Sequence, residues 1–271
     1  NAAGGNGADA GKSITQTADG KILVTGLSWD DNCTCYVSII WKYNIDGTLD
    51  TSFGGGNGYI VCPAPSYSFV WEDGMTVKVD GSGRIYNSGY IIGCGGTCKQ
   101  FVIYRYLPDG TLDTSFGGGT GYVIYSQIFG GIGEIIESDF TFDSMGRIII
   151  TGKTWNGNNY DMIVMRCNPD GTIDLSFCSG VGYRIYDYMA GNDAGVKVIC
   201  DSSNNIYITG YVTITGPGCA PSCQAIAVWK FLSDGSFDPS FNSGNCFIYY
   251  DLLKNHKNCK SISIVITITG E

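Results

Sequence analysis

Pairs of carboxylates recur along this chain at a fixed spacing. An eight-residue phrase occurs four times, as DGTLDTSF, DGTLDTSF, DGTIDLSF and DGSFDPSF, and each copy carries two aspartates four residues apart. Clustered carboxylates bind hard cations such as calcium, and this is the first chemistry that the phrase suggests. Calcium loops place their oxygen ligands closer together along the chain, so the spacing favours a structural role and predicts no cofactor. The eight aspartates are Asp46, Asp50, Asp109, Asp113, Asp170, Asp174, Asp234 and Asp238.

Three further positions recur together with the aspartates. A base lies four residues before each Asp-Gly step, and a serine and a phenylalanine close each phrase. Asp-Gly is typical of a turn, and the second aspartate can accept hydrogen bonds from the loop or pair with the base. We expect the phenylalanine to insert between neighbouring sheets. The bases are Lys42, Arg105, Arg166 and Lys230, and the phenylalanines are Phe53, Phe116, Phe177 and Phe241.

The residues for nucleophilic catalysis are scarce. His256 is the only histidine of the chain, and no serine–histidine–aspartate set can be composed around it in a reasonable arrangement. Carboxylates are abundant, but the turns of the repeat account for them. The sequence therefore predicts that the chain is not an enzyme.

Two tryptophans occupy matching places in the first and third repeats. Trp29 and Trp155 each come just after the second apolar run of their repeat, where a loop is expected. An exposed tryptophan in a loop can stack on a sugar ring, which makes a glycan-binding face one interpretation. The other interpretation is a loop anchor that packs on its own sheet, and it is favoured because only two repeats carry the residue.

Cysteine is frequent, with 12 residues against a single histidine. No Cys-x-x-Cys pair is present, so the pattern indicates disulfides rather than zinc, and disulfides indicate an oxidising compartment. The short spacing of Cys94 with Cys98, and of Cys219 with Cys223, suggests small closed loops. Two wider pairs are also candidates, and the connectivity stays open: Cys167 with Cys178, and Cys246 with Cys259.

Charge and hydropathy argue against two kinds of partner. The net charge is −9, and the lysines and arginines are scattered rather than clustered as binding to nucleic-acid phosphates requires. No stretch approaches the ~20 apolar residues of a membrane-spanning helix. The chain begins at Asn1 without an apolar leader, so we expect a mature form whose signal peptide has been removed. Together these features predict an extracellular or cell-surface protein.

The elements that must position these residues are short strands. The phrase returns after about 60 residues each time, and every period contains four short runs rich in Val, Ile, Thr and aromatic residues. No segment shows a helical period. The sequence therefore predicts an all-β fold, a β-propeller of four four-stranded antiparallel blades. The expected repeat units are residues 8–66, 70–130, 134–190 and 193–253, and both a closed four-bladed ring and half of a larger ring fit them.

The phrase and the glycine-rich loop after it resemble the delta-60 repeat of bacterial secreted and surface proteins, whose signature is DGxLDxSFGxxG. The segments Asp46 to Gly58 and Asp109 to Gly121 match it closely. The third and fourth copies depart from it, with Cys178 and Asn242 at the place of the first loop glycine. The resemblance covers most of the chain and implies a propeller-like β fold. The family has no well-defined activity to carry over.

A further strand is predicted after the fourth repeat, in residues 254–271. Small polar residues separate most of the isoleucines in an alternation of period two, which is typical of a strand. Such a strand needs a pairing partner, and pairing within the chain and donation to a neighbouring subunit both stay open. The isoleucines are Ile262, Ile264, Ile266 and Ile268.

Two functions follow as hypotheses. The first is a non-enzymatic structural subunit of an extracellular fibre or surface assembly, joined to copies of itself through its terminal strands. The alternative is a secreted glycan-binding or adhesive propeller module that uses the loop aromatics Trp29 and Trp155.

Overall fold

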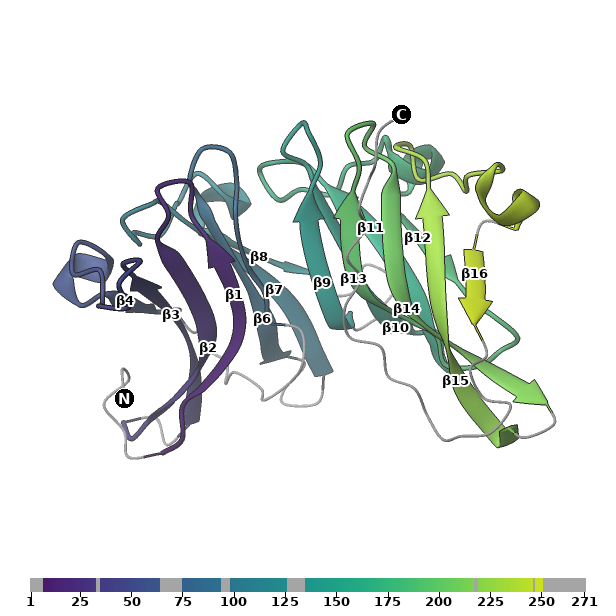
Figure 1. The fold of residues 1–271 in the computed structure, drawn as a ribbon, viewed down its shortest axis with the longest axis horizontal. Helices are drawn as coiled ribbons and strands as arrows, with labels where there is room; N and C mark the ends of the chain where they lie inside the picture. Colours follow the sequence, from purple (N-terminus) through teal and green to yellow (C-terminus); the bar gives the residue numbers. More distant parts are fainter. Residues whose placement is uncertain are drawn as a thin grey trace. The chain divides into compact units, whose positions relative to one another are not determined.

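Each repeat forms one four-stranded antiparallel sheet in the computed structural model of the chain (Figure 1). The structure describes residues 7–32, 35–63, 75–93, 98–125, 135–216, 219–245 and 247–250. The chain divides into two compact units, Asn1–Ile128 with the first two sheets and Phe129–Glu271 with the last two. These units are called unit 1 and unit 2 below. The predicted all-β fold of four antiparallel sheets with four strands each is confirmed.

Unit 1 contains two sheets whose strands pair in chain order. Because each strand is antiparallel to the next one along the chain, short connections suffice to join them. The first sheet consists of β1 (Ala10–Gln16), β2 (Ile22–Asp30), β3 (Cys35–Tyr43) and β4 (Tyr59–Val61). The second consists of β5 (Val77–Val79), β6 (Ile85–Gly93), β7 (Cys98–Tyr106) and β8 (Tyr122–Tyr125).

Unit 2 repeats the same topology. Its last hairpin, between β14 and β15, has the longest strands of the described chain. The third sheet consists of β9 (Ile136–Phe142), β10 (Ile148–Trp155), β11 (Tyr160–Cys167) and β12 (Tyr183–Tyr186). The fourth consists of β13 (Ala194–Cys200), β14 (Ile206–Gly216), β15 (Cys219–Phe231) and β16 (Phe247–Tyr250).

A single 3-10 turn follows each phrase and leads into the outer strand. These turns are η1 (Gly54–Gly56), η3 (Gly117–Gly119), η4 (Phe177–Gly180) and η5 (Phe241–Gly244). Cys178 and Asn242, which depart from the glycine of the repeat signature, adopt φ values of 52° and 47° there. The loop thus keeps its left-handed backbone without glycine, at a cost of about 1 kcal/mol for each such residue. No helix in the described part of the chain is long and apolar enough to cross a membrane.

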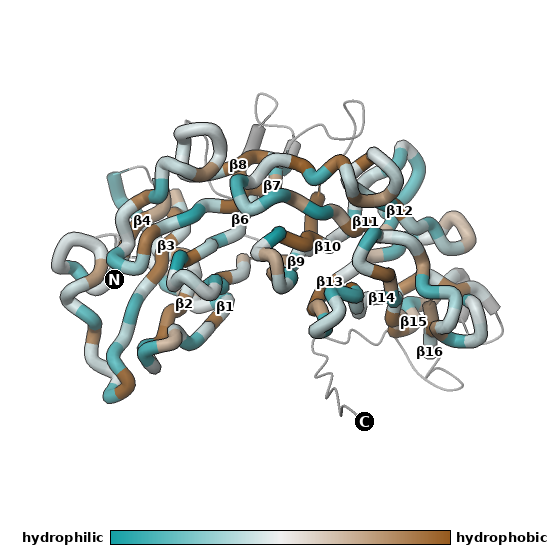
Figure 2. Tube along the Cα trace, turned by 90° about the horizontal axis from the view of Figure 1, so that it is seen from above, coloured by the Kyte–Doolittle hydropathy of each residue, from teal (hydrophilic) through white to brown (hydrophobic). Residues whose placement is uncertain are grey.

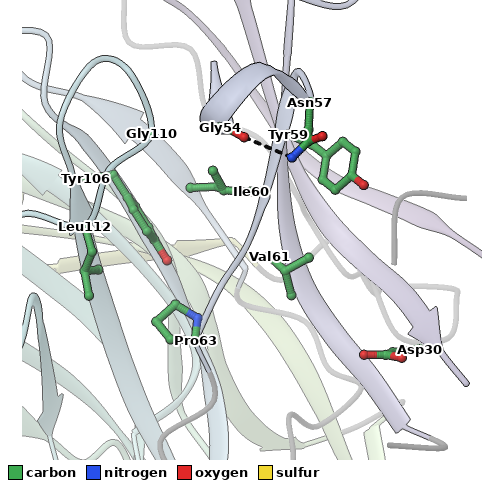
Figure 3. Close-up of a pocket in the computed structure, with 10 residues that line it drawn as sticks. All are labelled: Asp30, Gly54, Asn57, Tyr59, Ile60, Val61, Pro63, Tyr106, Gly110 and Leu112. Carbon is green, nitrogen blue, oxygen red and sulfur yellow. Dashed lines mark hydrogen bonds between the residues drawn. The ribbon is translucent and has the colours of Figure 1, made fainter. Parts of the chain in front are cut away.

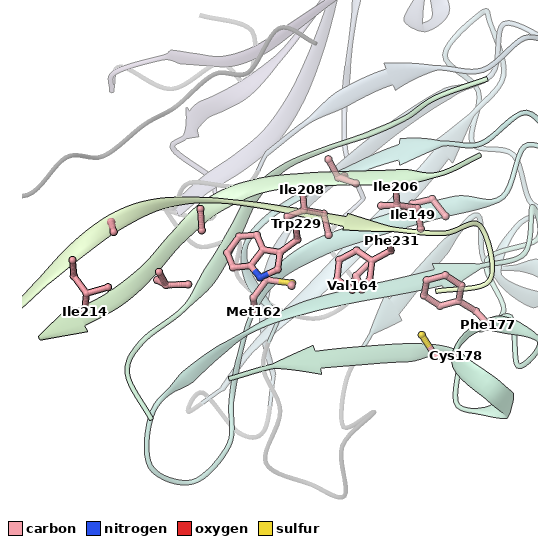
Figure 4. Packing of buried hydrophobic residues seen from close by; sticks show 14 residues of the cluster. Ile149, Met162, Val164, Phe177, Cys178, Ile206, Ile208, Ile214, Trp229 and Phe231 are labelled. Carbon is pink, nitrogen blue, oxygen red and sulfur yellow. The ribbon is translucent and has the colours of Figure 1, made fainter. Parts of the chain in front are cut away.

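Each unit has its own hydrophobic core between its two sheets. In unit 2, Trp229 and Phe231 of β15 pack with Met162 and Val164 of β11, and Phe177 of the third phrase joins the same cluster (Figure 4). Figure 2 shows the hydrophobic stretches along strands such as β10 and β14, whereas the turns are mostly hydrophilic. Unit 1 is organised in the same way, around Leu23, Ile40, Phe53, Val77, Ile85, Val102, Tyr104 and Tyr106.

The second strands of the first, third and fourth sheets each contain a Thr-Gly step, at Gly26, Gly152 and Gly210, and the glycine has a steric cause. In the first, third and fourth sheets, the first strand carries a bulge opposite this step, between Gly11 and Ser13 in the first sheet. A Cβ atom on Gly26 would lie 1.9 Å from the carbonyl oxygen of Ala10, and one on Gly210 would lie 1.8 Å from that of Ala194. Only glycine leaves room for the bulged neighbour to come this close.

Several predicted features fall outside the described residues. The C-terminal strand with Ile262, Ile264, Ile266 and Ile268 is one of them, and the cysteines Cys94, Cys246 and Cys259 are others. The boundaries of the four repeat units and the C-terminal segment 254–271 stay predictions.

Candidate functional site

The repeated phrase builds buried ion pairs. In the second sheet, Arg105 donates from Nε to Asp113 Oδ2 at 2.7 Å and from Nη2 to Ser115 Oγ at 2.8 Å. The same guanidinium lies 4.7 Å from the centre of the Phe116 ring. The third sheet repeats this arrangement with Arg166, Asp174, Ser176 and Phe177. The residues that recur in every phrase thus hold the blade together.

The first aspartate of each phrase closes its own turn. Asp109 Oδ1 accepts hydrogen bonds from Thr111 Oγ1 at 2.7 Å and from its backbone N–H at 2.9 Å, and these bonds lower the pKa of Asp109. The other phrases do the same, with Asp46 and Thr48, Asp170 and Thr172, and Asp234 and Ser236. In the described part of the chain, three carboxylates that could share a metal ion come together only at Asp161, Asp187 and Asp193.

Neighbouring phrases are also joined to each other within each unit. Gly54 donates its backbone N–H to the carbonyl of Asp109 at 2.9 Å in unit 1, and Cys178 donates to the carbonyl of Asp234 at 2.8 Å in unit 2. The bases of the phrases contribute side-chain hydrogen bonds to the same junctions. Lys42 Nζ donates to the Pro108 carbonyl at 3.1 Å. Arg166 reaches the Ser233 carbonyl in the same manner. This explains why the phrase recurs with so little change.

Acid is expected to destabilise unit 1 through Asp50. Burial acts to raise the pKa of Asp50, but hydrogen bonds from Lys21 and Ser52 outweigh it and lower the pKa to about 2. A carboxylate whose pKa falls on folding stabilises the fold above its unfolded pKa of about 3.9, and this contribution is lost as the pH falls towards 2. Urea unfolding followed by circular dichroism should therefore depend less on pH between about 2 and 4 in Asp50→Asn than in the wild type. Equal pH dependence of the two proteins would contradict this assignment.

The cysteines are only partly paired. Cys35 and Cys223 are disulfide-bonded, whereas Cys62, Cys167, Cys178 and Cys200 carry thiols. The predicted pair of Cys167 with Cys178 is therefore wrong. The Cys178 thiol lies 3.5 Å from the Gly235 carbonyl, so it faces the phrase of the fourth sheet instead. The side chains of Cys98 and Cys219, the first at the start of β7 and the second at the start of β15, lie outside the described ones.

The two matched tryptophans have matched surroundings. Trp29 lies opposite Tyr36 and Trp155 lies opposite Tyr160, with ring centres 4.9 and 5.0 Å apart in edge-to-face contact. Trp29 also donates from Nε1 to Asp31 Oδ1 at 2.8 Å. Both indole rings are half-buried against their own sheets. Such packing fits an anchor, and a role in glycan binding stays a prediction.

A groove of about 490 Å³ runs along the edge strand β4 of unit 1 (Figure 3). In Figure 3, Ile60 lies on the side of β4 that faces Tyr106 and Leu112, whereas the Tyr59 ring points to the other side. Asp30 and Asn57 supply a carboxylate and an amide, and Tyr59 supplies a half-buried ring. The remaining lining residues are Gly54, Val61, Pro63, Tyr106, Gly110 and Leu112.

Unit 2 gathers three carboxylates near the loop end of β10 and β11. Oxygen atoms of Asp161, Asp187 and Asp193 lie within 4.8 Å of one another. Asp193 is 0% exposed and Asp161 is 3% exposed, whereas Asp187 lies at the surface. Burial and the charges of Asp187 and Asp161 together raise the pKa of Asp193 to about 7, although the hydrogen bonds from Tyr188 and Thr213 act to lower it. Burial also raises the pKa of Asp161.

Neither of these two sites was among the residues predicted from the sequence. The groove combines residues of three separate segments. Of the three carboxylates, Asp161 lies in β11, whereas Asp187 follows β12 and Asp193 precedes β13. One signal was present, because residues 156–159 read Asn-Gly-Asn-Asn where the other repeats carry cysteines. Two of these asparagines hold Asp161, since Asn156 Nδ2 and Asn159 Nδ2 each donate to its carboxylate at 2.7 Å.

The comparison with protein families supports the propeller fold. The β-propeller family described as a domain of unknown function, DUF5122, matches residues 17–53, 95–116 and 146–177. Each matched segment ends on the phenylalanine that closes a phrase. No curated protein sequence matches the chain significantly.

Solved propellers are similar to the chain in fold. An α-L-arabinanase from Penicillium chrysogenum complexed with arabinobiose is 11% identical, with a TM-score of 0.52 over 88% of this chain and 65% of that one. A mutant α-L-arabinofuranosidase from Fusarium graminearum, bound to an iminosugar inhibitor, is 10% identical, with a TM-score of 0.53 over 83% of this chain and 63% of that one. The chain thus spans less than two thirds of either enzyme. A fucose lectin from Kordia zhangzhouensis is 15% identical, with a TM-score of 0.38 over 65% of this chain and 97% of that one.

These neighbours correct two predictions. The hypothesis of a non-enzymatic fibre subunit is contradicted, because the two solved structures above with TM-scores of 0.52 and 0.53 are an arabinanase and an arabinofuranosidase. The prediction of no enzyme depended on the missing histidine-based set. Glycoside hydrolysis needs only two suitably placed carboxylates, so the lack of a serine–histidine–aspartate set does not exclude a glycoside hydrolase. The chain is an all-β protein of the propeller type.

Proposed function

We propose that the chain is a carbohydrate-binding β-propeller and that the groove along β4 takes a short oligosaccharide. The observation that carries this proposal is the composition of the groove, which combines aromatic and aliphatic walls with a carboxylate and an amide. Ligand sites of small molecules have this character, with an apolar lining and a few polar groups that fix orientation.

The groups of the groove suit a sugar. A pyranose or furanose ring has an apolar face that can pack on Tyr59, and its hydroxyls can donate to the Asp30 carboxylate. Asn57 donates from Nδ2 to the Gly54 carbonyl at 3.1 Å, which fixes the amide at the rim. Tyr106 is buried on the inner wall, and burial raises the pKa of its hydroxyl well above the usual value, so it stays protonated.

The comparisons support the same class of ligand. The arabinanase and the arabinofuranosidase with TM-scores above 0.5 are both named for their action on arabinose-containing carbohydrates. The disulfide-bonded cysteines Cys35 and Cys223 support an extracellular location, where glycans are abundant.

Replacement of Tyr59 by alanine is expected to abolish most of the sugar affinity. Loss of the stacking ring should weaken binding about tenfold, since such a contact contributes about 1.5 kcal/mol. The measurement is a glycan array, followed by titration calorimetry with the best-bound oligosaccharide. Tyr183→Ala is the matched control, because Tyr183 begins β12 as Tyr59 begins β4. Binding that Tyr59→Ala and Asp30→Asn leave unchanged would contradict the proposal.

The same oligosaccharides should be recovered and analysed after incubation. Intact sugars would identify a binding module, whereas shortened products would identify a glycan-degrading enzyme. Absence of binding to any carbohydrate on the array would overturn the proposed function.

A further inference from the structure

Two of the three clustered carboxylates of unit 2 are buried without a positive partner. The ion pairs of the described residues do not include Asp161, Asp187 or Asp193. Asp193 accepts hydrogen bonds from the backbone N–H groups of Tyr188 at 2.5 Å and Thr213 at 3.2 Å. These bonds fix the position of the carboxylate but do not neutralise its charge. Buried carboxylates are ordinarily paired with a base or coordinate a metal.

A second observation points to a missing ligand at the same place. The Thr154 hydroxyl is buried, with 1% of the residue exposed, and it has no hydrogen-bond partner among the described residues. Thr154 of β10 lies directly opposite Asp161 of β11 in the antiparallel register. Side chains of directly opposite residues project from the same face of a sheet, so the hydroxyl is directed to the side of the carboxylates. An unpaired buried hydroxyl costs about 1–3 kcal/mol unless something binds to it.

We propose that Asp161, Asp187 and Asp193, together with the Thr154 hydroxyl, form a binding site for a divalent cation of the calcium type. All four groups are oxygen ligands, which hard cations prefer, and the set contains neither imidazole nor thiolate. Calcium accepts six to eight oxygens in flexible geometry, so solvent can complete the shell on the side of the exposed Asp187. The site lies in unit 2 and is independent of the sugar groove of unit 1.

A cation bound at this site would link two segments that are separate in the sequence. Thr154 and Asp161 belong to the β10–β11 hairpin, whereas Asp187 and Asp193 flank the connection from β12 to β13. The two segments already touch, because Asp193 donates its backbone N–H to the Tyr160 carbonyl at 2.7 Å. Binding would therefore tie the third sheet to the fourth and stabilise unit 2.

The test is binding of calcium to the full chain after treatment with a chelator. We expect calcium to raise the melting temperature, since a ligand that binds only the folded state stabilises it. Terbium is a second probe, because Trp155 and Tyr160 belong to the same hairpin and should sensitise its emission. Calcium should displace the terbium, and magnesium should do so less well because it demands a stricter octahedral shell.

Variants locate the site. Asp187→Asn changes an exposed ligand and should weaken calcium binding about tenfold or more without unfolding the chain. Thr154→Val removes the hydroxyl at nearly constant volume and should weaken binding several-fold. The control is Asp170→Asn, which removes an exposed turn carboxylate of the same unit and should bind calcium like the wild type. The proposal is overturned if millimolar calcium neither shifts the melting temperature nor binds, or if Asp187→Asn binds calcium as tightly as the wild type.

Discussion

Replacing Arg105 with methionine is expected to lower the free energy of unfolding by about 3–5 kcal/mol. The side chain of Arg105 is 3% exposed and that of Asp113 is 9% exposed, and their charged atoms lie 2.7 Å apart. Methionine fills much of the same space, but it leaves the Asp113 carboxylate buried without its base. It also removes the hydrogen bond to Ser115 and the cation–π contact with Phe116. An unpaired buried charge is among the most damaging single changes a fold can suffer.

The same sheet offers a matched control for Arg105→Met. Arg84 donates from Nε to Asp80 Oδ2 at the same distance of 2.7 Å, but the side chain of Arg84 is 33% exposed. The side chain of Asp80 is as little exposed as that of Asp113, but Asp80 keeps hydrogen bonds from the backbone N–H groups of Ser82 and residue 84 and from the Tyr86 hydroxyl. The Arg84→Met variant should therefore lose about 1 kcal/mol or less. Urea unfolding followed by circular dichroism measures both variants. Equal losses would show that burial does not govern the strength of these pairs.

The roles of the repeated phrase could be read from the sequence because they are local. The turn at each Asp-Gly step, and the pairing of Arg105 and Arg166 with the second aspartate, involve residues within about ten positions of one another. Local hydrogen bonding of this kind follows from residue type and spacing. The recurrence of the phrase then indicated the number of sheets, because like units stack on like units.

The two candidate sites could not be predicted in this way. The groove takes Asp30, Tyr59 and Tyr106 from three different strands. The carboxylate site combines the β10–β11 hairpin with the connection from β12 to β13. Only Gly110 and Leu112 of the groove belong to the repeated phrase, and no residue of the carboxylate site does, so the recurrence of the phrase does not indicate either site. The Cys167–Cys178 pair failed for a related reason. Nearness along the chain does not establish a disulfide, because the turn η4 places the Cys178 thiol against the Gly235 carbonyl of the fourth phrase.

Gly110→Ala is expected to destabilise the chain by about 2–5 kcal/mol, although it adds a single methyl group. Gly110 has a φ of +91°, which alanine adopts only under strain. A Cβ atom there would also lie 2.8 Å from Phe53 Cε2 and 3.1 Å from the backbone nitrogen of Gly54. That methyl group would push the Phe53 ring out of the core and break the bond from Gly54 to Asp109 that joins the two sheets.

Gly47→Ala separates backbone strain from steric overlap. Gly47 occupies the same place in the first phrase and has a φ of +84°, but a Cβ atom there would meet nothing within 4 Å. Its alanine variant should lose only the strain of the left-handed backbone, about 1 kcal/mol. The difference between the two variants, measured as unfolding free energies in urea, therefore reports the fit of one phrase against the next. If Gly110→Ala and Gly47→Ala were equally stable, neighbouring phrases would not be packed as closely as the structure shows, and the recurring Asp-Gly step would serve the turn alone.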